Sequence, residues 1–481
     1  MFPASCRLNH NDNIFVVMDC VLGTPVCNQF LWEIDCVFDA KHFQKIGESL
    51  KHGRISRSLV RTRLGRDHWV QDENAGHLSI ARPDEYVRSG ADQWAQEMLR
   101  ETPVNVHGGK SWIFAAAPTA ADTTVVLFVC SHAVGDGSAM ILALQEACAG
   151  TPKPLPATRP ASLLDNLRDQ GTLLQQMMGA TRELLRGGKV DAGADTAAGA
   201  EPDAAEGAEA AEEANVAQAD VPRSEGSRKL VAVTFAVDYA EFEQRARQSA
   251  GTANSLFAAV VGRVAQRLGT LPSTTGVQPL AVPMSKRKSP AELQSNLTQG
   301  ATAQLDLSTG IYADLSGVRG QMKQAYAKAA GKPGAADLLF EVAQGLPDWL
   351  VKRLNKADSA PRALASNLGK VPADIACLGM DALTENPVPR SFLSARTTLV
   401  ENAPALTAAD PASTNAWACV VGDSLVVSLV APELLSAQED PHSTEELTTE
   451  KLTVDRAFQA ELAAWGLKGK RIYSAPNSVD S

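Results

Sequence analysis

The sequence lacks the features of a membrane-spanning, secreted or nucleic-acid-binding protein. No apolar run approaches the roughly 20 residues that a transmembrane helix needs. The first residues, MFPASCRLNHNDN, do not combine a basic segment with an apolar core, so they predict no secretory signal. The formal charge is −10, whereas nucleic-acid binding usually requires a basic face. These absences favour a cytoplasmic protein that does not bind nucleic acid.

Paired cysteines are also lacking, although the chain has 8 cysteines. No Cys-x-x-Cys pair occurs, and the cysteines do not alternate with histidine as zinc ligands do. We therefore interpret them as small apolar side chains in a reducing compartment.

The length of 481 residues, with 44% apolar and 21% charged residues, is typical of a soluble protein with two domains. Between the halves, Asp191 to Ala219 consists almost entirely of Ala, Gly, Glu and Asp, without Lys, Arg or an aromatic residue. Because this composition cannot bury a core, it predicts a disordered connector. We expect an N-terminal lobe over 1–188, the connector over 189–226 and a C-terminal lobe over 227–481.

The stretch from Asp122 to Cys148 is organised around one side chain, His132. The apolar run 125–129 is rich in β-branched residues and predicts a strand buried on both faces. Helical spacing begins after Gly137, with Ser138 as a candidate N-cap. His132 is therefore expected at the exit of a rigid strand.

The sequence His-x-x-x-Asp-Gly at 132–137 suits a general base. Neutral imidazole accepts protons near pH 7, so His132 could deprotonate an alcohol, amine or thiol that attacks an acyl group. Asp136 could orient the imidazole, or pair with an arginine and hold the loop. Gly135 and Gly137 would allow a tight turn and the close approach of a substrate. The alternative is a structural histidine bonded to a nearby carbonyl.

These residues resemble the coenzyme-A-dependent acyltransferase superfamily, whose motif is His-His-x-x-x-Asp-Gly or His-x-x-x-Asp. The group includes chloramphenicol acetyltransferase, condensation domains of nonribosomal peptide synthetases, and bacterial wax ester synthase/diacylglycerol acyltransferases. In the family the second histidine is catalytic, and His132 occupies that position. Ser131 stands where the doubled motif has its first histidine.

Further matches favour the wax ester synthase branch. Residues 7–35 resemble its N-terminal region and are expected to form two strands separated by Gly23-Thr24-Pro25. Asn254-Ser255 stands where that group has Asn-Asp, and Asn296 stands where it has Gly-Asn. Residues 279–287 resemble a strand that ends in Val-Pro-Val-Ser-x-Arg, so the resemblance makes Arg287 the expected partner of Asp136.

A last match lies at 364–372, which resembles Ser-Asn-x-x-Gly-Pro in wax ester synthases. Amide and hydroxyl groups at a strand end can stabilise an oxyanion, so Asn367 is a candidate donor, and Ser366 a weaker one. Gly369 fits the same motif, although a plain turn also explains it.

The resemblance implies an α/β fold of two chloramphenicol-acetyltransferase-like lobes with mixed sheets and an active-site tunnel between them. It implies O-acyl transfer from acyl-CoA, as co-substrate, to a fatty alcohol or diacylglycerol, with no metal and no permanently bound cofactor. One alternative is a condensation-like enzyme fed by a carrier protein. Another is a non-catalytic module that binds acyl carriers or partners. A place at a membrane or lipid-droplet surface fits the lipid acceptors.

Local patterns predict several further elements. We expect helices over 39–50, 252–268 and 453–465, a strand over 230–237, and antiparallel pairing of 111–114 with 125–129. Hairpins are expected around Trp69, Leu78 and Ile80 and around Gly422-Asp423-Ser424. Arginines 54, 57, 61, 63 and 66 form a basic patch, either a solvated face or a site for coenzyme A phosphates.

Overall fold

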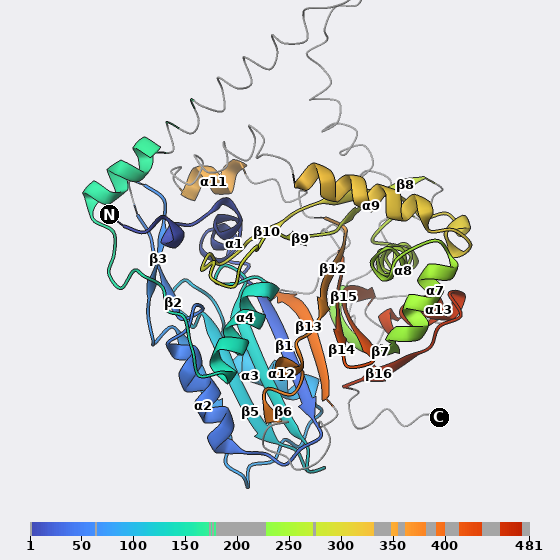
Figure 1. The fold of residues 1–481 in the computed structure, drawn as a ribbon, viewed down its shortest axis with the longest axis horizontal. Coiled ribbons are helices and arrows are strands. Elements are labelled where there is room, and N and C mark those ends of the chain that lie inside the picture. The colour runs from blue at the N-terminus through green and yellow to red at the C-terminus, as the bar shows by residue number, and fades with distance from the viewer. Residues whose placement is uncertain are drawn as a thin grey trace, which may run out of the picture.

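Two sheet-rich lobes lie side by side in the computed structural model (Figure 1). The structure describes residues 2–62, 65–172, 175, 178, 228–272, 276–330, 348–354, 361–380, 391–399, 413–434 and 453–473. The expected connector, 189–226, lies outside these residues. No helix in the described part of the chain is long and apolar enough to cross a membrane. The mixed α/β class with two lobes, which the sequence predicts, is confirmed.

The first half of the chain builds the N-terminal lobe. Its elements are η1 (Ala4–Cys6), α1 (His10–Cys20), β1 (Val26–Ile34), α2 (Ala40–Lys51), β2 (Arg57–Val60), β3 (His68–Gln71), β4 (Gly76–Ile80), α3 (Ala91–Glu101), β5 (Trp112–Pro118), β6 (Thr124–Ser131) and α4 (Gly137–Cys148).

The second half supplies the other lobe. Its elements are β7 (Arg228–Asp238), α7 (Tyr239–Gln248), α8 (Ala253–Arg267), β8 (Val277–Ala281), β9 (Met284–Ser285), β10 (Thr298–Gln299), β11 (Thr302–Asp306), η2 (Thr309–Tyr312), α9 (Ser316–Ala329), α11 (Asp348–Leu354), β12 (Ala363–Lys370), α12 (Ala373–Ala376), β13 (Ser391–Leu399), β14 (Thr414–Val421), β15 (Ser424–Leu434), α13 (Val454–Ala464) and β16 (Gly469–Ile472).

The N-terminal sheet has the strand order β13-β1-β6-β5-β4 and carries His132 at the end of its central strand. Every residue of β6 is buried, with Val126 and Phe128 in one core cluster and Leu127 and Val129 in the other. This confirms the strand buried on both faces. The pairing of β5 with β6 is antiparallel, as expected.

The two halves of the chain are joined through β13. This strand comes from the second half, yet it pairs antiparallel with β1 at the edge of the N-terminal sheet. Leu393 and Ala395 of β13 pack in the same buried cluster as Phe30 and Phe128. Trp417 and Val421 of the C-terminal sheet belong to that cluster too, so one apolar core spans both lobes.

The C-terminal sheet has the order β11-β8-β12-β14-β15-β7-β16, and helices α7, α8 and α13 lie together beside it in Figure 1. The expected strand over 230–237 is part of β7, and the expected helices over 39–50, 252–268 and 453–465 are α2, α8 and α13. The hairpin of β14 and β15 turns at Gly422 and Asp423, as predicted.

Three local predictions are wrong. The first apolar run of 7–35 forms α1 and not a strand, because Asn9 and Asp12 make a capping box that starts a helix. The segments around Trp69 and Leu78 do not form a hairpin, since β3 pairs with β2 and β4 pairs in parallel with β5. The N-cap of α4 is Asp136 and not Ser138, because the Asp136 carboxylate accepts a hydrogen bond from the Ala139 N–H.

Candidate active site

His132 follows β6 directly and is held by the backbone on both sides of the strand end. Its N–H donates to the Val26 carbonyl of β1 over 2.8 Å, and the Ser131 N–H donates to the Ser111 carbonyl over 2.9 Å. The residue keeps part of its surface exposed, whereas Ser131 and Ala133 are buried. The ring is therefore fixed at its base and still partly accessible.

The imidazole of His132 contacts two side chains from distant parts of the chain. The Phe15 ring of α1 stacks on it with centroids 3.7 Å apart and an interplanar angle of 11°. Its Nδ1 lies 3.0 Å from Oδ1 of Asn296, which precedes β10. The Asn296 side chain also donates to Oδ1 of Asp12, 3.0 Å away, and to the His132 carbonyl, 2.8 Å away.

Burial shifts the pKa values of both ionisable groups in this arrangement. It lowers the pKa of His132 below the ordinary 6.5, against the opposing effects of hydrogen bonds and of Asp136. It raises the pKa of Asp12 to about 6, although hydrogen bonds from Asn296 and the nearby Arg57 lower it. At pH 7 the imidazole is therefore neutral, which is the state that a general base requires.

Asp136 ties α4 to the second half of the chain. Its Oδ1 accepts from the Ala139 N–H at 2.8 Å and from Arg287 at 3.4 Å. Its Oδ2 accepts from the Leu297 N–H at 2.8 Å and the Thr298 hydroxyl at 3.1 Å. The structure thus contains the Asp136–Arg287 pair expected from the resemblance, with both side chains at most 5% exposed.

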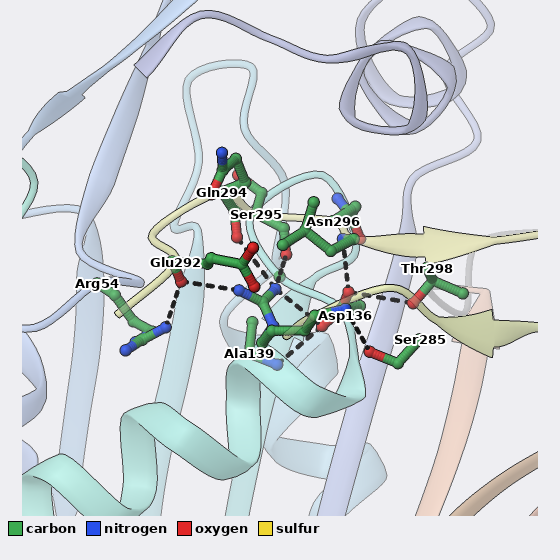
Figure 2. A network of polar contacts seen from close by, with 12 residues as sticks. Arg54, Asp136, Ala139, Ser285, Glu292, Gln294, Ser295, Asn296 and Thr298 are labelled. Atoms are coloured by element: carbon green, nitrogen blue, oxygen red, sulfur yellow. Dashed lines mark hydrogen bonds and ion pairs between the residues drawn. The ribbon is translucent and has the colours of Figure 1, made fainter. Parts of the chain in front are cut away.

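Residues 286–297, which link β9 to β10, form a loop that arginines hold against the N-terminal lobe (Figure 2). Arg54 donates to the Pro290 and Glu292 carbonyls, and Arg57 donates to the Ser295 hydroxyl. Arg287 donates to the carbonyls of Glu292, Gln294 and Ser295. This loop, called the arginine-held loop below, delivers Asn296 to His132.

The arginines of the expected basic patch are engaged within the chain. Arg54 and Arg57 are 1% exposed, and Arg54 also pairs with Glu146. Arg61 pairs with Asp67 and Asp348, and Arg66 pairs with Asp169. Arg63 lies outside the described residues. Arg54 and Arg57 are therefore buried in the fold, whereas the Arg61 side chain is 40% exposed and belongs to a partly solvated face.

Asn254 and Asn367 lie in a different cluster, where α8 meets the end of β12. The Asn367 amide donates to Oδ1 of Asn254 over 3.3 Å, and Asn254 donates to the Tyr326 hydroxyl over 3.0 Å. Oδ1 of Asn367 accepts from the Gly369 N–H, and Gly369 has a φ of +73°, which glycine adopts without strain. Asn367 and Gly369 line a cavity of about 410 Å³ together with Phe257 of α8.

The opposite face of β12 meets α4. A Cβ atom at Gly137 would lie 2.7 Å from Leu368 Cδ2 and 3.2 Å from Trp417 Cζ3, so this glycine allows the lobes to approach closely. Ser366, two residues before Leu368, is paired with Trp417 in the parallel ladder and shares this face. Asn367 consequently points away from α4, while Ser366 faces the same side as Trp417.

The remaining motif residues have structural contacts. The Gly135 carbonyl accepts from the Asn28 amide, and the Ser131 carbonyl accepts from the Val134 N–H. Ser255, which stands where the resemblance expects Asp, completes a capping box with Thr252 at the start of α8. Ser255 therefore has a structural role, as part of the cap of α8.

Sequence reasoning did not single out Asp12 and Phe15. Both lie on α1, in the segment that the apolar pattern assigned to a strand. The signal that could have found Asp12 is the spacing Asn9-x-x-Asp12, which is typical of a capped helix start. A helix places residues 12 and 15 on one face, because they are three positions apart.

A comparison of the sequence with protein-family models and with curated proteins finds no match. Solved structures do match in fold. The condensation domain of the monacolin K polyketide synthase MokA has a TM-score of 0.51 at 11% identity, over 96% of each chain. The first condensation domain of the CDA synthetase has 0.50 at 10% identity, over 95% of this chain and 96% of that one.

Polyketide synthase associated protein 5 from Mycobacterium tuberculosis also matches, with a TM-score of 0.50 at 12% identity over 96% of this chain and 99% of that one. These likenesses extend over nearly the whole length of each chain. The chain therefore has a fold like that of these condensation domains.

Proposed function

We propose that this protein transfers an acyl group from a carrier-protein thioester to the hydroxyl or amine of an acceptor, as a condensation-like acyltransferase. One observation carries the proposal: a partly accessible imidazole, whose pKa burial lowers, is fixed by Asn296 and Phe15. The likeness in fold to condensation domains supports this class of reaction.

In this mechanism His132 is the general base. Its Nδ1 faces Asn296, so Nε2 takes the proton of the acceptor as the acceptor oxygen or nitrogen attacks the thioester carbonyl. When the tetrahedral intermediate collapses, the carbon–sulfur bond breaks and the imidazolium returns the proton to the leaving thiolate. The products are an ester or amide and a free thiol, and no bond to the protein forms.

The oxyanion donor is proposed on the face of the C-terminal sheet that meets Gly137. The Trp417 indole N–H is buried there, with the residue 6% exposed, and it has no acceptor in the described part of the protein. Ser366 is its neighbour in the ladder. A preorganised donor of this kind stabilises developing negative charge without reorganisation. Asn367 is directed elsewhere, toward Asn254.

The contacts of the arginines in residues 54–66 support a carrier protein, and not free coenzyme A, as the acyl donor. Free coenzyme A carries phosphates that favour basic side chains, but Arg54, Arg57 and Arg66 are held in internal contacts. A carrier protein presents its thioester arm through a protein surface instead. Acyl-CoA with a fatty alcohol or diacylglycerol is the second candidate, favoured by the resemblance of 7–35 and 279–300 to wax ester synthases.

A paired donor assay tests the proposal. The same acyl group is offered on a phosphopantetheinylated carrier protein and on coenzyme A, each with an alcohol and with an amine acceptor, and thiol release and product are measured. We expect product from the carrier-bound thioester, and its loss in His132→Ala. Product from acyl-CoA alone would favour the second candidate. No acyl transfer from either donor would contradict the enzyme and favour a binding module.

A further inference from the structure

We propose that Asp12 and Asn296 are positioning residues that set which nitrogen of His132 carries the proton. This inference deepens the proposed function, because it concerns the base of that same site. In water, neutral imidazole prefers its proton on Nε2, the nitrogen that the mechanism needs as an acceptor. A contact that moves the proton to Nδ1 therefore raises the fraction of His132 that can act through Nε2.

The orientation of the Asn296 amide follows from the groups around its nitrogen. Nδ2 lies 3.0 Å from Asp12 Oδ1, 2.8 Å from the His132 carbonyl and 3.4 Å from the Ala133 carbonyl. Two of these groups are carbonyls and the third is a carboxylate, so all three accept hydrogen bonds and none donates when Asp12 is ionised. A reversed amide would place its oxygen against three acceptors, so the nitrogen must lie on this side.

This orientation determines the tautomer of the imidazole. The amide oxygen of Asn296 lies 3.0 Å from Nδ1 of His132, and an amide oxygen only accepts. Nδ1 must therefore carry the proton. In the neutral ring the lone pair then belongs to Nε2.

Hydrogen bonds fix the Asp12 carboxylate in the position where it accepts from the Asn296 amide. It is 1% exposed, and its Oδ1 also accepts from the Asn296 N–H over 3.0 Å. Oδ2 accepts from the Asn9 N–H over 3.4 Å and from the Trp69 indole over 3.5 Å. Both oxygens thus face donors. The charged groups near the network are Arg57, which acts on Asp12, and Asp136, which acts on His132.

Helix α1 provides two of the groups that fix the ring. Asp12 acts through Asn296, and Phe15, one turn later, covers the ring face. Since the arginine-held loop brings Asn296, the base is assembled from three separate segments: the end of β6, helix α1 and that loop. A purely structural alternative assigns Asp12 only to capping α1 and anchoring the loop.

The tautomer can be measured without any substrate. Protein labelled with ¹⁵N at histidine is examined by long-range ¹H–¹⁵N correlation, in which the protonated nitrogen and the lone-pair nitrogen have well-separated shifts. The signals of His132 are assigned by their absence in His132→Gln. We expect the wild type to carry its proton on Nδ1 at pH 7.

Three variants are compared for the position of the proton on His132. Asn296→Ala removes the amide acceptor and should move His132 part of the way toward the Nε2–H form, because the hydrogen bond of the ring to its own carbonyl remains. Asp12→Ala should give a smaller movement, because two carbonyls still hold Asn296. Asp19→Asn is the matched control: Asp19 is a buried carboxylate on the same helix, but it accepts from the Val106 N–H and not from the His132 network, so it should match the wild type. Asp12→Asn replaces Asp12→Ala if the latter does not fold.

Activity gives the second measurement. Asn296→Ala should lower kcat several-fold, and less than His132→Ala, with KM nearly unchanged, because a larger fraction of His132 then carries its proton on Nε2. A wild-type proton on Nε2, or a tautomer unaffected by Asn296→Ala, would overturn the inference. Failure of the proposed function looks different: the tautomer responds as stated, yet no acyl transfer occurs with any donor.

Discussion

Two polar clusters contain His132 and the three motif asparagines, and they are built differently. In the His132 cluster, side chains from α1 and from the arginine-held loop converge on the imidazole that follows β6. In the cluster of Asn254, Asn367 and Tyr326, the side chains bond one another where α8 meets β12. The first cluster holds a base with a lowered pKa, and the second holds only neutral polar groups. The difference indicates that only the first is organised for proton transfer.

His132→Ala should produce the largest effect on activity. A positioned base contributes about two to four powers of ten in rate, so turnover should fall by that amount while thermal stability stays close to that of the wild type. Steady-state kinetics and a melting curve on the same preparation measure both. If the variant instead loses stability and its activity follows the folded fraction, His132 is a structural histidine.

The Asp136–Arg287 pair should have the next largest effect, and on stability as well as activity. Both partners are buried, so Asp136→Asn or Arg287→Gln leaves an uncompensated group and should cost roughly 3 to 5 kcal/mol of unfolding free energy. The double variant should cost less than the sum of the two single variants. Urea unfolding measures all three.

The exposed pair of Arg82 and Glu85 is the control for this cycle, because its side chains are 74% and 50% exposed. Its double-mutant cycle should show almost no coupling. Strict additivity for Asp136 and Arg287 would mean that their contact does not stabilise the junction of the lobes.

Asn367→Ala should have the smallest effect. Its side chain bonds Asn254 and its own turn, so its removal should change unfolding free energy by roughly 0.5 kcal/mol and turnover by about twofold or less. The same kinetic assay, with Trp417→Phe beside it, compares the two candidate oxyanion donors. A hundredfold loss in Asn367→Ala and none in Trp417→Phe would restore Asn367 to the oxyanion role.

Sequence patterns predicted the elements whose burial is decided locally. The continuous apolar run of β6 and the capped start of α8 are examples, since β-branched residues and a Thr cap act within a few positions. The pattern failed at α1, where apolar residues 14–18 suit either a strand or a helix and the cap decides.

The candidate site could be predicted only in part, because its contacts join positions far apart in the chain. The motif at 132–137 identified the base, and the resemblance identified Arg287 as a partner. The partner of the imidazole, however, lies 164 residues after it at Asn296, and Asp12 lies 284 residues before Asn296. No local spacing encodes such distances. Ser366 and Asn367 are neighbours in β12 and therefore lie on opposite faces of the sheet. Which of the two faces α4 depends on what packs against each side of the sheet, and the local sequence does not show this.

The pH dependence of acyl transfer tests the central claim most directly. Since burial lowers the pKa of His132 below 6.5 and the neutral ring is the base, activity should be complete at pH 7 and fall as the pH drops through that lowered pKa. His132→Gln should lack this limb in its residual activity. A limb that persists in His132→Gln would show that another group titrates, such as Asp12 with its pKa of about 6, and would contradict His132 as the general base.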